Sequence, residues 1–238
     1  MNTDPLTFDA RLIPRRDPSR LTLGDCRREF SRHTSPKLIA AALALALLAR
    51  LAVGRFTYQD LIVPGFLLLS EPLTEWLIHV YILHSPGLRL GSLRLEPLAA
   101  PEHRLHHAQP NELRWVFIPT AALLAFIPAI AGVIALYTLP VHLLLGGPYL
   151  PEFLSGLCVG YGILLTYEWT HFLIHTPYRP RSFYYRLIWR NHRLHHYKNE
   201  RFWFGVTSHL GDVALGTNPP QQLVDRSPTA RALGGGVA

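Results

Sequence analysis

The sequence predicts an all-α, polytopic membrane protein with four transmembrane helices, and three observations lead to this fold class. Of the 238 residues, 49% are hydrophobic and 16% are charged, and the mean hydropathy is above zero. Four long apolar segments, each near the length of a bilayer-spanning helix, alternate with polar stretches rich in arginine. A single Lys or Arg, Arg50, falls inside these segments. The composition excludes a disordered chain and an ordinary soluble domain.

The elements follow in chain order. Residues 1–37 form a polar, basic N-terminal segment, which is too long to be the short basic start of a secretory signal, so we expect the first apolar segment to be retained. Residues 38–218 form the membrane domain, and residues 219–238 a flexible C-terminal tail ending in Gly-Gly-Gly-Val-Ala. The predicted spans are Leu38–Val53, Leu61–His84, Trp115–Tyr137 and Leu150–His175. We expect Arg50 to reach the nearer interface by snorkelling.

The distribution of basic residues predicts the orientation in the membrane. All Lys and Arg except Arg50 and Arg55 lie in residues 1–37, 85–114 or 177–238. Because cytoplasmic loops carry the excess of positive charge, these three regions, and both termini with them, are expected to be cytoplasmic. A net charge of +7 in so hydrophobic a chain fits anionic lipid better than nucleic acid. Cys26 and Cys158 differ too much in setting to predict a disulfide.

Histidine is the unusual residue, with 13 in the chain. Ten of them form four groups at the ends of the second and fourth spans and in the polar segments that follow. These are His79 and His84; His103, His106 and His107; His171 and His175; and His192, His195 and His196. A spacing of three or four residues places side chains on one face of a helix. We expect His33, His142 and His209 to be ordinary surface or hydrogen-bonded residues.

Such a set of imidazoles predicts a transition-metal site. Neutral imidazole suits iron, zinc, copper and nickel, whereas magnesium and calcium prefer oxygen ligands. Ten ligands are too many for one ion, so two metal ions with about five nitrogens each are expected. Four polar residues are candidate outer partners that hold an imidazole N–H: Glu75, Glu168, Asn191 and Asp212.

The spacing of these histidines resembles that of the integral-membrane fatty acid hydroxylase and sterol desaturase superfamily, and within it the fatty acid 2-hydroxylases. Three stretches carry the closer likeness: His103–Pro119, Gly160–His175 and His192–Thr217. The resemblance covers about residues 60–218. It implies four transmembrane helices under a cytosolic helical cap, with the ten histidines holding two iron ions, although zinc can occupy the same ligands.

The resemblance also implies a reaction, which is O₂-dependent hydroxylation of a lipid acyl chain with two electrons from a carrier. Some members of the superfamily carry a fused haem-binding cytochrome b domain, and residues 1–37 are too short to be one. The expected partners are therefore a membrane lipid substrate and a separate electron-transfer protein, with no nucleic acid. The prevalence of arginine over lysine and the compact length favour a bacterial inner-membrane protein.

Other readings stay open at this point. Within the same superfamily the substrate can be a sterol, carotenoid, hopanoid or alkylglycerol, and the outcome can be desaturation. A different class is a non-redox zinc-binding or zinc-transport membrane protein, although transport sites are expected near the bilayer midplane. A third is a basic protein that binds anionic lipid or nucleic acid, but the rule that positive loops are cytoplasmic already accounts for most of the arginines.

Overall fold

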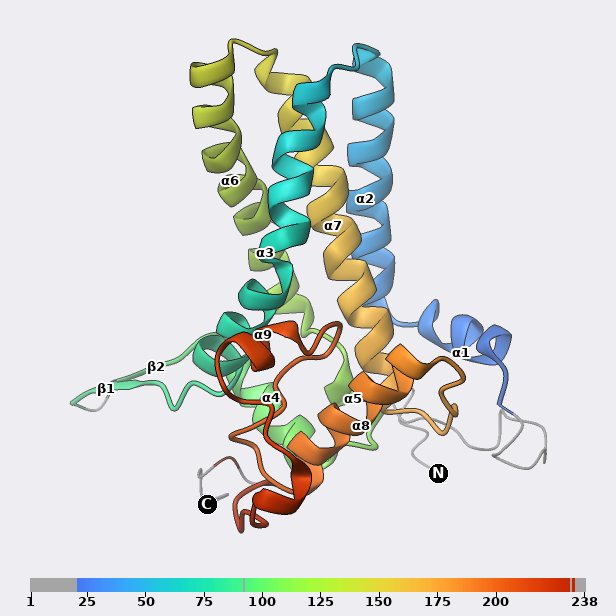
Figure 1. Ribbon diagram of the computed structural model, residues 1–238, viewed down its shortest axis with the longest axis vertical. Helices are drawn as coiled ribbons and strands as arrows, with labels where there is room; N and C mark the ends of the chain where they lie inside the picture. The colour runs from blue at the N-terminus through green and yellow to red at the C-terminus, as the bar shows by residue number, and fades with distance from the viewer. Residues whose placement is uncertain (1–20, 92, 232, 234–238) are drawn as a thin grey trace. The chain divides into compact units, whose positions relative to one another are not determined.

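The computed structural model describes residues 21–91, 93–231 and 233 (Figure 1). The described elements are α1 (Leu23–Phe30), α2 (Thr34–Val53), a 3-10 turn (Tyr58–Leu61), α3 (Ile62–Ile78), a π-helical turn (His79–Leu83), β1 (Leu88–Leu90), β2 (Leu93–Leu95), α4 (Ala100–Ala108), α5 (Leu113–Val116), α6 (Thr120–Leu145), α7 (Tyr149–Ile174), α8 (Phe183–Tyr197), α9 (Leu210–Ala214) and a 3-10 turn (Gln221–Leu223). The all-α fold class is confirmed. The short β1–β2 hairpin is an addition that the sequence pattern did not predict.

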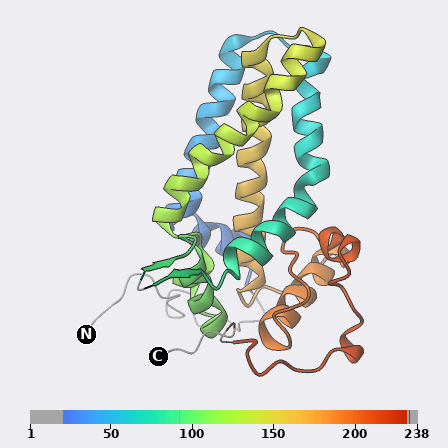
Figure 2. The ribbon, with the colours of Figure 1, turned by 90° about the vertical axis from the view of Figure 1, so that its left-hand side faces the viewer.

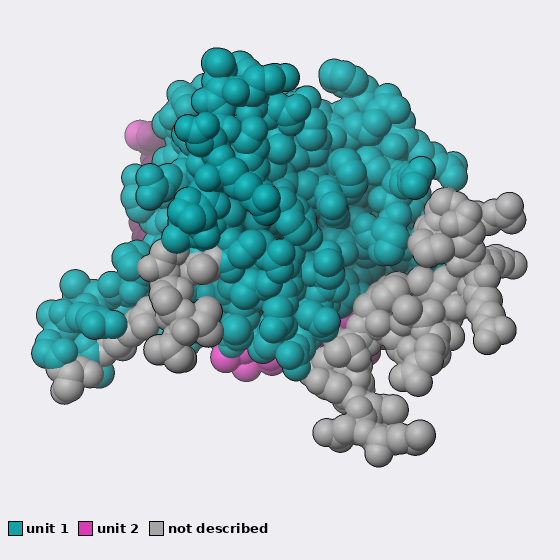
Figure 3. All heavy atoms as spheres, turned by 90° about the horizontal axis from the view of Figure 1, so that it is seen from below, with its two compact units in different colours: residues 1–30, 72–119, 169–238 teal, residues 31–71, 120–168 magenta. Residues whose placement is uncertain are grey.

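The chain divides into two compact units, coloured separately in Figure 3. Unit 2 comprises Ser31–Glu71 and Thr120–Glu168, which contain α2, the 3-10 turn Tyr58–Leu61, α6 and most of α3 and α7. Unit 1 comprises Met1–Phe30, Pro72–Pro119 and Trp169–Ala238, with the remaining elements. Within unit 2 the long helices run alongside one another in both ribbon views (Figures 1 and 2).

Four segments are long and apolar enough to cross a membrane, as the sequence predicted: Thr34–Val53, Tyr58–Leu83, Leu113–Leu145 and Tyr149–Ile174. The predicted end of the third span at Tyr137 was wrong, because α6 continues to Leu145 through Pro140. In an apolar medium the backbone must satisfy its hydrogen bonds within the helix, and a nearby Ser or Thr compensates for a proline. The carbonyl that loses its donor at Pro140 is that of Leu136, four residues earlier. The Thr138 hydroxyl donates instead to the Ile134 carbonyl, at 2.7 Å.

Arg50 also differs from its predicted role. Its side chain is buried rather than extended to an interface, with an exposed fraction of 4%. A guanidinium nitrogen lies 3.0 Å from the Asp60 carboxylate, and Nε donates to the Ser155 hydroxyl at 2.7 Å. A charge in an apolar surrounding is costly unless it is paired, and Asp60 supplies the pair within unit 2.

The core of unit 2 depends on two glycines of α7. Buried Ala46, Val63, Ile134, Leu154, Leu157 and Tyr161 form this core. A methyl group at Gly156 would lie 2.6 Å from Cγ2 of Ile134, and one at Gly160 would lie 2.7 Å from its Cδ1. This Gly-x-x-x-Gly spacing lets α6 approach α7 closely, as small residues do between membrane helices.

Unit 1 contains parts of both segments that the sequence analysis placed outside the membrane domain. Residues 1–20 of the predicted N-terminal segment lie outside the described residues, but Phe30 of α1 is buried, with its ring centroid 5.0 Å from that of Trp169. Of the predicted flexible tail, Val224 and Ala230 are buried. Arg231 donates to the carbonyls of His107 and Ala108 at 2.9 and 2.5 Å. The prediction of a flexible tail is therefore corrected for Val224, Ala230 and Arg231, which are buried or hydrogen-bonded to α4.

Replacing both helix-contact glycines by alanine is expected to loosen unit 2. Gly156→Ala/Gly160→Ala forces Ile134 out of its position, and overpacking of this kind costs about 1–3 kcal/mol. Gly162→Ala is the matched control on the same helix, since nothing lies within 4 Å of a methyl group there. Thermal unfolding in detergent measures the effect. A double variant as stable as the control would contradict the close packing of α6 on α7.

Candidate metal centre

The first histidine pair owes its geometry to a π-helical turn at the end of α3. In an α-helix, residues five apart point about 140° away from each other at 100° per residue. Here the backbone N–H of His84 donates to the carbonyl of His79 at 3.0 Å, the i→i+5 bond of a π-helix. The wider turn brings both imidazoles to one side, where their ring centroids lie 4.9 Å apart.

The two His-x-x-His-His motifs lie on short helices, α4 and α8, both in unit 1. On α4, His103 and His107 are one turn apart, and His106 points about 100° away from His107. On α8, His192 and His196 are one turn apart and His195 is the offset member. Each motif thus presents a pair of imidazoles one turn apart in one direction, with their rings edge to face, and a single imidazole in another.

The ten histidines gather into two groups of five. The first group is His79, His84, His103, His107 and His195; the second group is His106, His171, His175, His192 and His196. Within each group one nitrogen of every imidazole lies within 4.8 Å of the others. Each group therefore contains a pair from a long helix segment, a pair from one motif and the offset member of the other motif.

The two groups adjoin each other and are closed to solvent. The rings of His107 and His196, which belong to different groups, lie 4.1 Å apart. Nine of the ten side chains are buried, and five of them have no exposed surface at all. His84 is the partly exposed member. The three remaining histidines, His33, His142 and His209, belong to neither group.

Backbone carbonyls orient four of these imidazoles. The Nδ1–H of His79 donates to Phe204 at 2.6 Å, that of His195 to Phe202 at 2.8 Å. His107 and His171 likewise donate to Ala230 and Val116, each at 2.9 Å. A carbonyl only accepts hydrogen bonds, so it fixes the proton on Nδ1 and leaves the Nε2 lone pair available.

The free nitrogens fit a metal ion. Nε2 of His79, His103, His107 and His175 is buried, and no described residue offers it a hydrogen bond. Nε2 of His195 lies 3.2 Å from that of His84, and Nε2 of His196 lies 3.0 Å from that of His192. Two nitrogens bound to one ion at about 2.0–2.1 Å lie about 2.9 Å apart at a right angle and about 3.4 Å apart at a tetrahedral angle. The observed spacings fall in this range.

The protonation state of the imidazoles also suits metal binding. Burial lowers the pKa of His107 from 6.5 to about 3. Burial, and after it the neighbouring imidazoles, lower the pKa of His103, His106, His192 and His196 well below 6.5. These imidazoles are therefore neutral at pH 7, which is the form that binds metal ions.

Glu75 and Asp212 do not accept the imidazole N–H groups directly, as was predicted. They hold the backbone segment whose carbonyls orient the imidazoles. Glu75 accepts hydrogen bonds from the amides of Val206 and Thr207 and from the Thr207 hydroxyl. Asp212 accepts from the amides of Phe204 and Gly205 at 2.9 and 2.8 Å. The carbonyls of Phe202 and Phe204, which hold His195 and His79, belong to the segment that these two carboxylates fix.

The other two predicted outer partners need correction as well. The amide of Asn191 donates to Asn218 at 3.2 Å, and its oxygen accepts from Arg190 at 3.0 Å. Glu168 accepts from the Ser35 hydroxyl, while the carbonyl of Val116 holds the Nδ1–H of His171. The acceptors of the imidazole N–H groups that were not predicted are backbone carbonyls. Because every residue has a carbonyl, the residue types do not reveal them.

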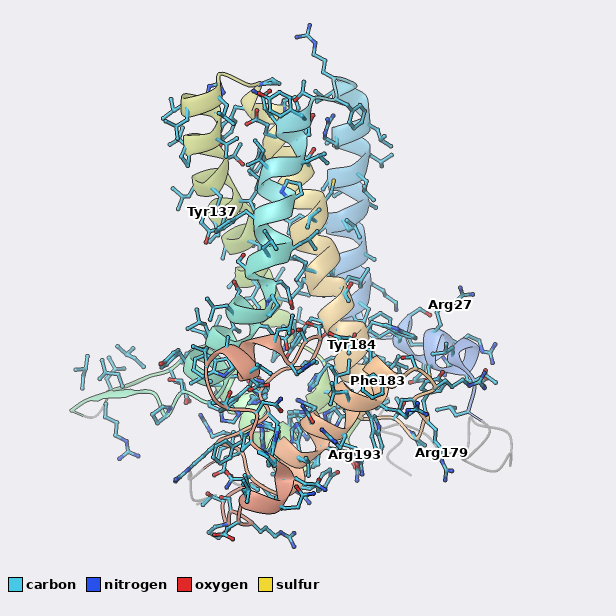
Figure 4. The ribbon with its side chains drawn as sticks, in the orientation of Figure 1. Arg27, Tyr137, Arg179, Phe183, Tyr184 and Arg193 are labelled. Atoms are coloured by element: carbon cyan, nitrogen blue, oxygen red, sulfur yellow. The ribbon has the colours of Figure 1, made fainter. Side chains whose placement is uncertain are left out.

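Two further features hold the 202–207 segment in place. Trp203, buried to 1% exposure, has a φ of 57°, a left-handed conformation that costs about 1–3 kcal/mol in a non-glycine residue. Its amide donates to the Thr217 carbonyl at 2.8 Å. Tyr184, labelled at the start of α8 in Figure 4, donates its hydroxyl to the Thr207 carbonyl at 2.6 Å.

Comparison with known proteins identifies the family of this chain. The family model described as fatty acid hydroxylase matches residues 65–217, which include all ten clustered histidines. The chain belongs to the fatty acid hydroxylase family. The resemblance found in the sequence is confirmed, and residues 202–207 of this chain lie inside the match.

Curated relatives are similar over the same region. A dihydroceramide fatty acyl 2-hydroxylase of Arabidopsis thaliana is 28% identical over 66% of this chain and 61% of its own length. Fatty acid 2-hydroxylases of Macaca fascicularis and Homo sapiens are 29% and 28% identical over 72% of this chain. The chain spans 61% of the plant protein and 43% and 42% of the two primate proteins.

A solved structure shares the fold. The hydroxylase domain of full-length scs7p superposes with a TM-score of 0.57 at 17% identity, over 88% of this chain and 71% of that chain. Together, the family, the fold and the histidine groups identify an integral membrane protein with a metal site.

Glu75→Gln and Asp212→Asn are each expected to weaken metal binding about 10- to 100-fold, the usual effect of removing an outer partner of a ligand. Either change replaces an acceptor oxygen by an N–H that faces backbone amides. Competition of the purified protein with a chelator for Zn²⁺ measures the affinity. Asp225→Asn, at an exposed carboxylate, is the control. Wild-type affinity in both variants would show that segment 202–207 does not orient His79 and His195.

Proposed function

We propose that this protein is a membrane-bound, O₂-dependent di-iron hydroxylase that inserts oxygen into a lipid acyl chain, as the fatty acid 2-hydroxylases do. The observation that carries the proposal is the pair of adjoining five-histidine groups in a chain of the fatty acid hydroxylase family. The proposed ligands are all ten clustered histidines. Five nitrogens on a six-coordinate ion leave one position open.

Iron fits this proposal better than zinc, although zinc is able to occupy the same nitrogens. Iron ions in the two groups would supply the redox chemistry that O₂ activation requires, which zinc does not have. The overall reaction consumes the C–H bond, O₂, two electrons and two protons, and yields the alcohol and water. The chain's own residues hold the ligand nitrogens neutral, fix their orientation through carbonyls and exclude water by burial.

A separate electron-transfer protein is the proposed source of the two electrons. The proposed substrate class is the fatty acyl chain of a membrane lipid, because the similar proteins are fatty acid 2-hydroxylases, a dihydroceramide fatty acyl 2-hydroxylase among them. A lipid substrate suits a protein with four apolar helices, because an acyl chain then reaches the enzyme without crossing water. We place both termini and the metal site in the cytoplasm of a bacterium, with the spans in its inner membrane, on the distribution of arginines.

His106→Ala and His195→Ala are each expected to abolish product formation while leaving an inserted protein. Each histidine belongs to a different group and has no exposed surface, so each change removes one nitrogen from one ion. Untargeted lipid mass spectrometry of expressing cells is the measurement, and a species with one added oxygen is the expected wild-type product. His33→Ala, which changes a histidine outside both groups, is expected to retain the product.

The outcomes separate the competing functions. A 2-hydroxyacyl species supports the proposal together with its regiochemistry, whereas an oxidised sterol, carotenoid, hopanoid or alkylglycerol keeps the chemistry and changes the substrate. An unsaturated product in place of an alcohol assigns a desaturase. No wild-type product even with added reductant and candidate lipids, combined with zinc flux into liposomes, would replace the proposal by zinc transport.

A further inference from the structure

The β1–β2 hairpin is amphipathic. Its antiparallel register pairs Leu88 with Leu95, Arg89 with Arg94, and Leu90 with Leu93. Because successive side chains along a strand point to opposite faces, the four leucines share one face of the hairpin and the two arginine positions share the other. The sequence LRL-GS-LRL thus encodes a ribbon with one apolar face and one basic face.

The leucine face has no cover among the described residues. The exposed fractions are 60% for Leu88, 55% for Leu90, 55% for Leu93 and 48% for Leu95. In Figure 1 the hairpin projects from the rest of unit 1 as a thin ribbon. An isolated two-stranded hairpin is marginally stable in water, and a contiguous exposed apolar patch marks an interaction surface.

The base of the hairpin is fixed on both sides by one residue of α4. Arg104 donates to the Ser85 carbonyl at 3.2 Å before β1 and to the Glu96 carboxylate at 2.5 Å after β2. Arg104 is adjacent to His103, so the hairpin is attached directly to the helix that carries three of the clustered histidines. The projecting ribbon is therefore held by its base and is not a loose loop.

The bilayer is within reach of this ribbon. The apolar span ends at Leu83, and Leu88 follows five residues later. An extended chain covers at most about 3.3–3.6 Å per residue, so β1 begins within about 18 Å of the end of the membrane helix. This length is no greater than the thickness of one leaflet with its headgroups, about 20–22 Å, so the hairpin stays within reach of the bilayer interface.

We propose that the hairpin is an interfacial membrane anchor, with its leucine face in the acyl boundary and Arg89, on the opposite face, at the level of anionic lipid phosphates. An apolar face opposite a basic face is the pattern of segments that lie in the bilayer interface. On the opposite face the Arg89 side chain is exposed, and an anionic lipid phosphate attracts its charge. The bilayer interface offers an acyl layer to the leucine face and phosphates to the basic face.

Photo-cross-linking tests the anchor on the wild-type protein. The full chain is placed in lipid nanodiscs that contain phosphatidylglycerol with a diazirine near the middle of the acyl chain. Trypsin cleaves after Arg89 and Arg94, so the peptide Leu90–Arg94 is recovered by itself. Lipid adducts on Leu90 or Leu93 are expected. Adducts on α3 and α7 peptides without any on this peptide would overturn the proposal.

A fluorescent label distinguishes the two faces. Leu90→Cys and Arg89→Cys, made in a Cys26→Ala/Cys158→Ala background, place the same probe on neighbouring residues that point in opposite directions. Quenching by nitroxide-labelled acyl chains is expected to be several-fold stronger at position 90, and quenching by aqueous iodide stronger at position 89. Equal iodide quenching at both positions overturns the anchor. Shielding at position 90 without lipid quenching, together with chain-to-chain cross-links, overturns it in favour of a second copy as the occupant.

Discussion

The structure of unit 1 depends on the gathering of ten imidazoles, nine of them buried, into two adjoining groups. A buried ring nitrogen without a partner costs about 1–3 kcal/mol, and each imidazole has two. The fold supplies a carbonyl for one nitrogen of His79, His107, His171 and His195, and the spacing of the remaining nitrogens fits a metal ion. Segments distant in sequence are therefore held together because each of them supplies ring nitrogens, or the partners that those ring nitrogens require.

The two groups are not independent sites. Because α4 gives two histidines to the first group and one to the second, and α8 does the reverse, any movement of either helix changes both groups together. The rings of His107 and His196, tilted at 33° with centroids 4.1 Å apart, add a direct contact between the groups. The repeated sequence pattern, a pair at a helix end followed by His-x-x-His-His, thus becomes an exchange of the offset histidines between the two halves.

The sequence predicted those features of the fold and the site that depend only on the type of side chain and on its spacing along a helix. The four spans follow from apolar length, and the convergence of the histidines follows from their i, i+3 and i, i+4 spacing. The assignment of each histidine to a group did not follow, because His79 and His84 require a π-helical turn that no residue type announces. The imidazole acceptors are backbone carbonyls of Val116, Phe202 and Phe204, which every residue possesses. The boundary at Tyr137 failed because Pro140 is tolerated in an apolar helix, and Arg50 found a partner, Asp60, on a different segment.

The carbonyl that orients His107 belongs to Ala230, near the end of the chain and beyond the residues matched by the family model. This hydrogen bond closes a loop of 123 residues, so His107 is oriented only when the segment around Ala230 has folded back onto α4. A proteolytic cut between Thr217 and Ala230 would therefore leave all ten histidines in the chain and still remove the acceptor that orients one of them.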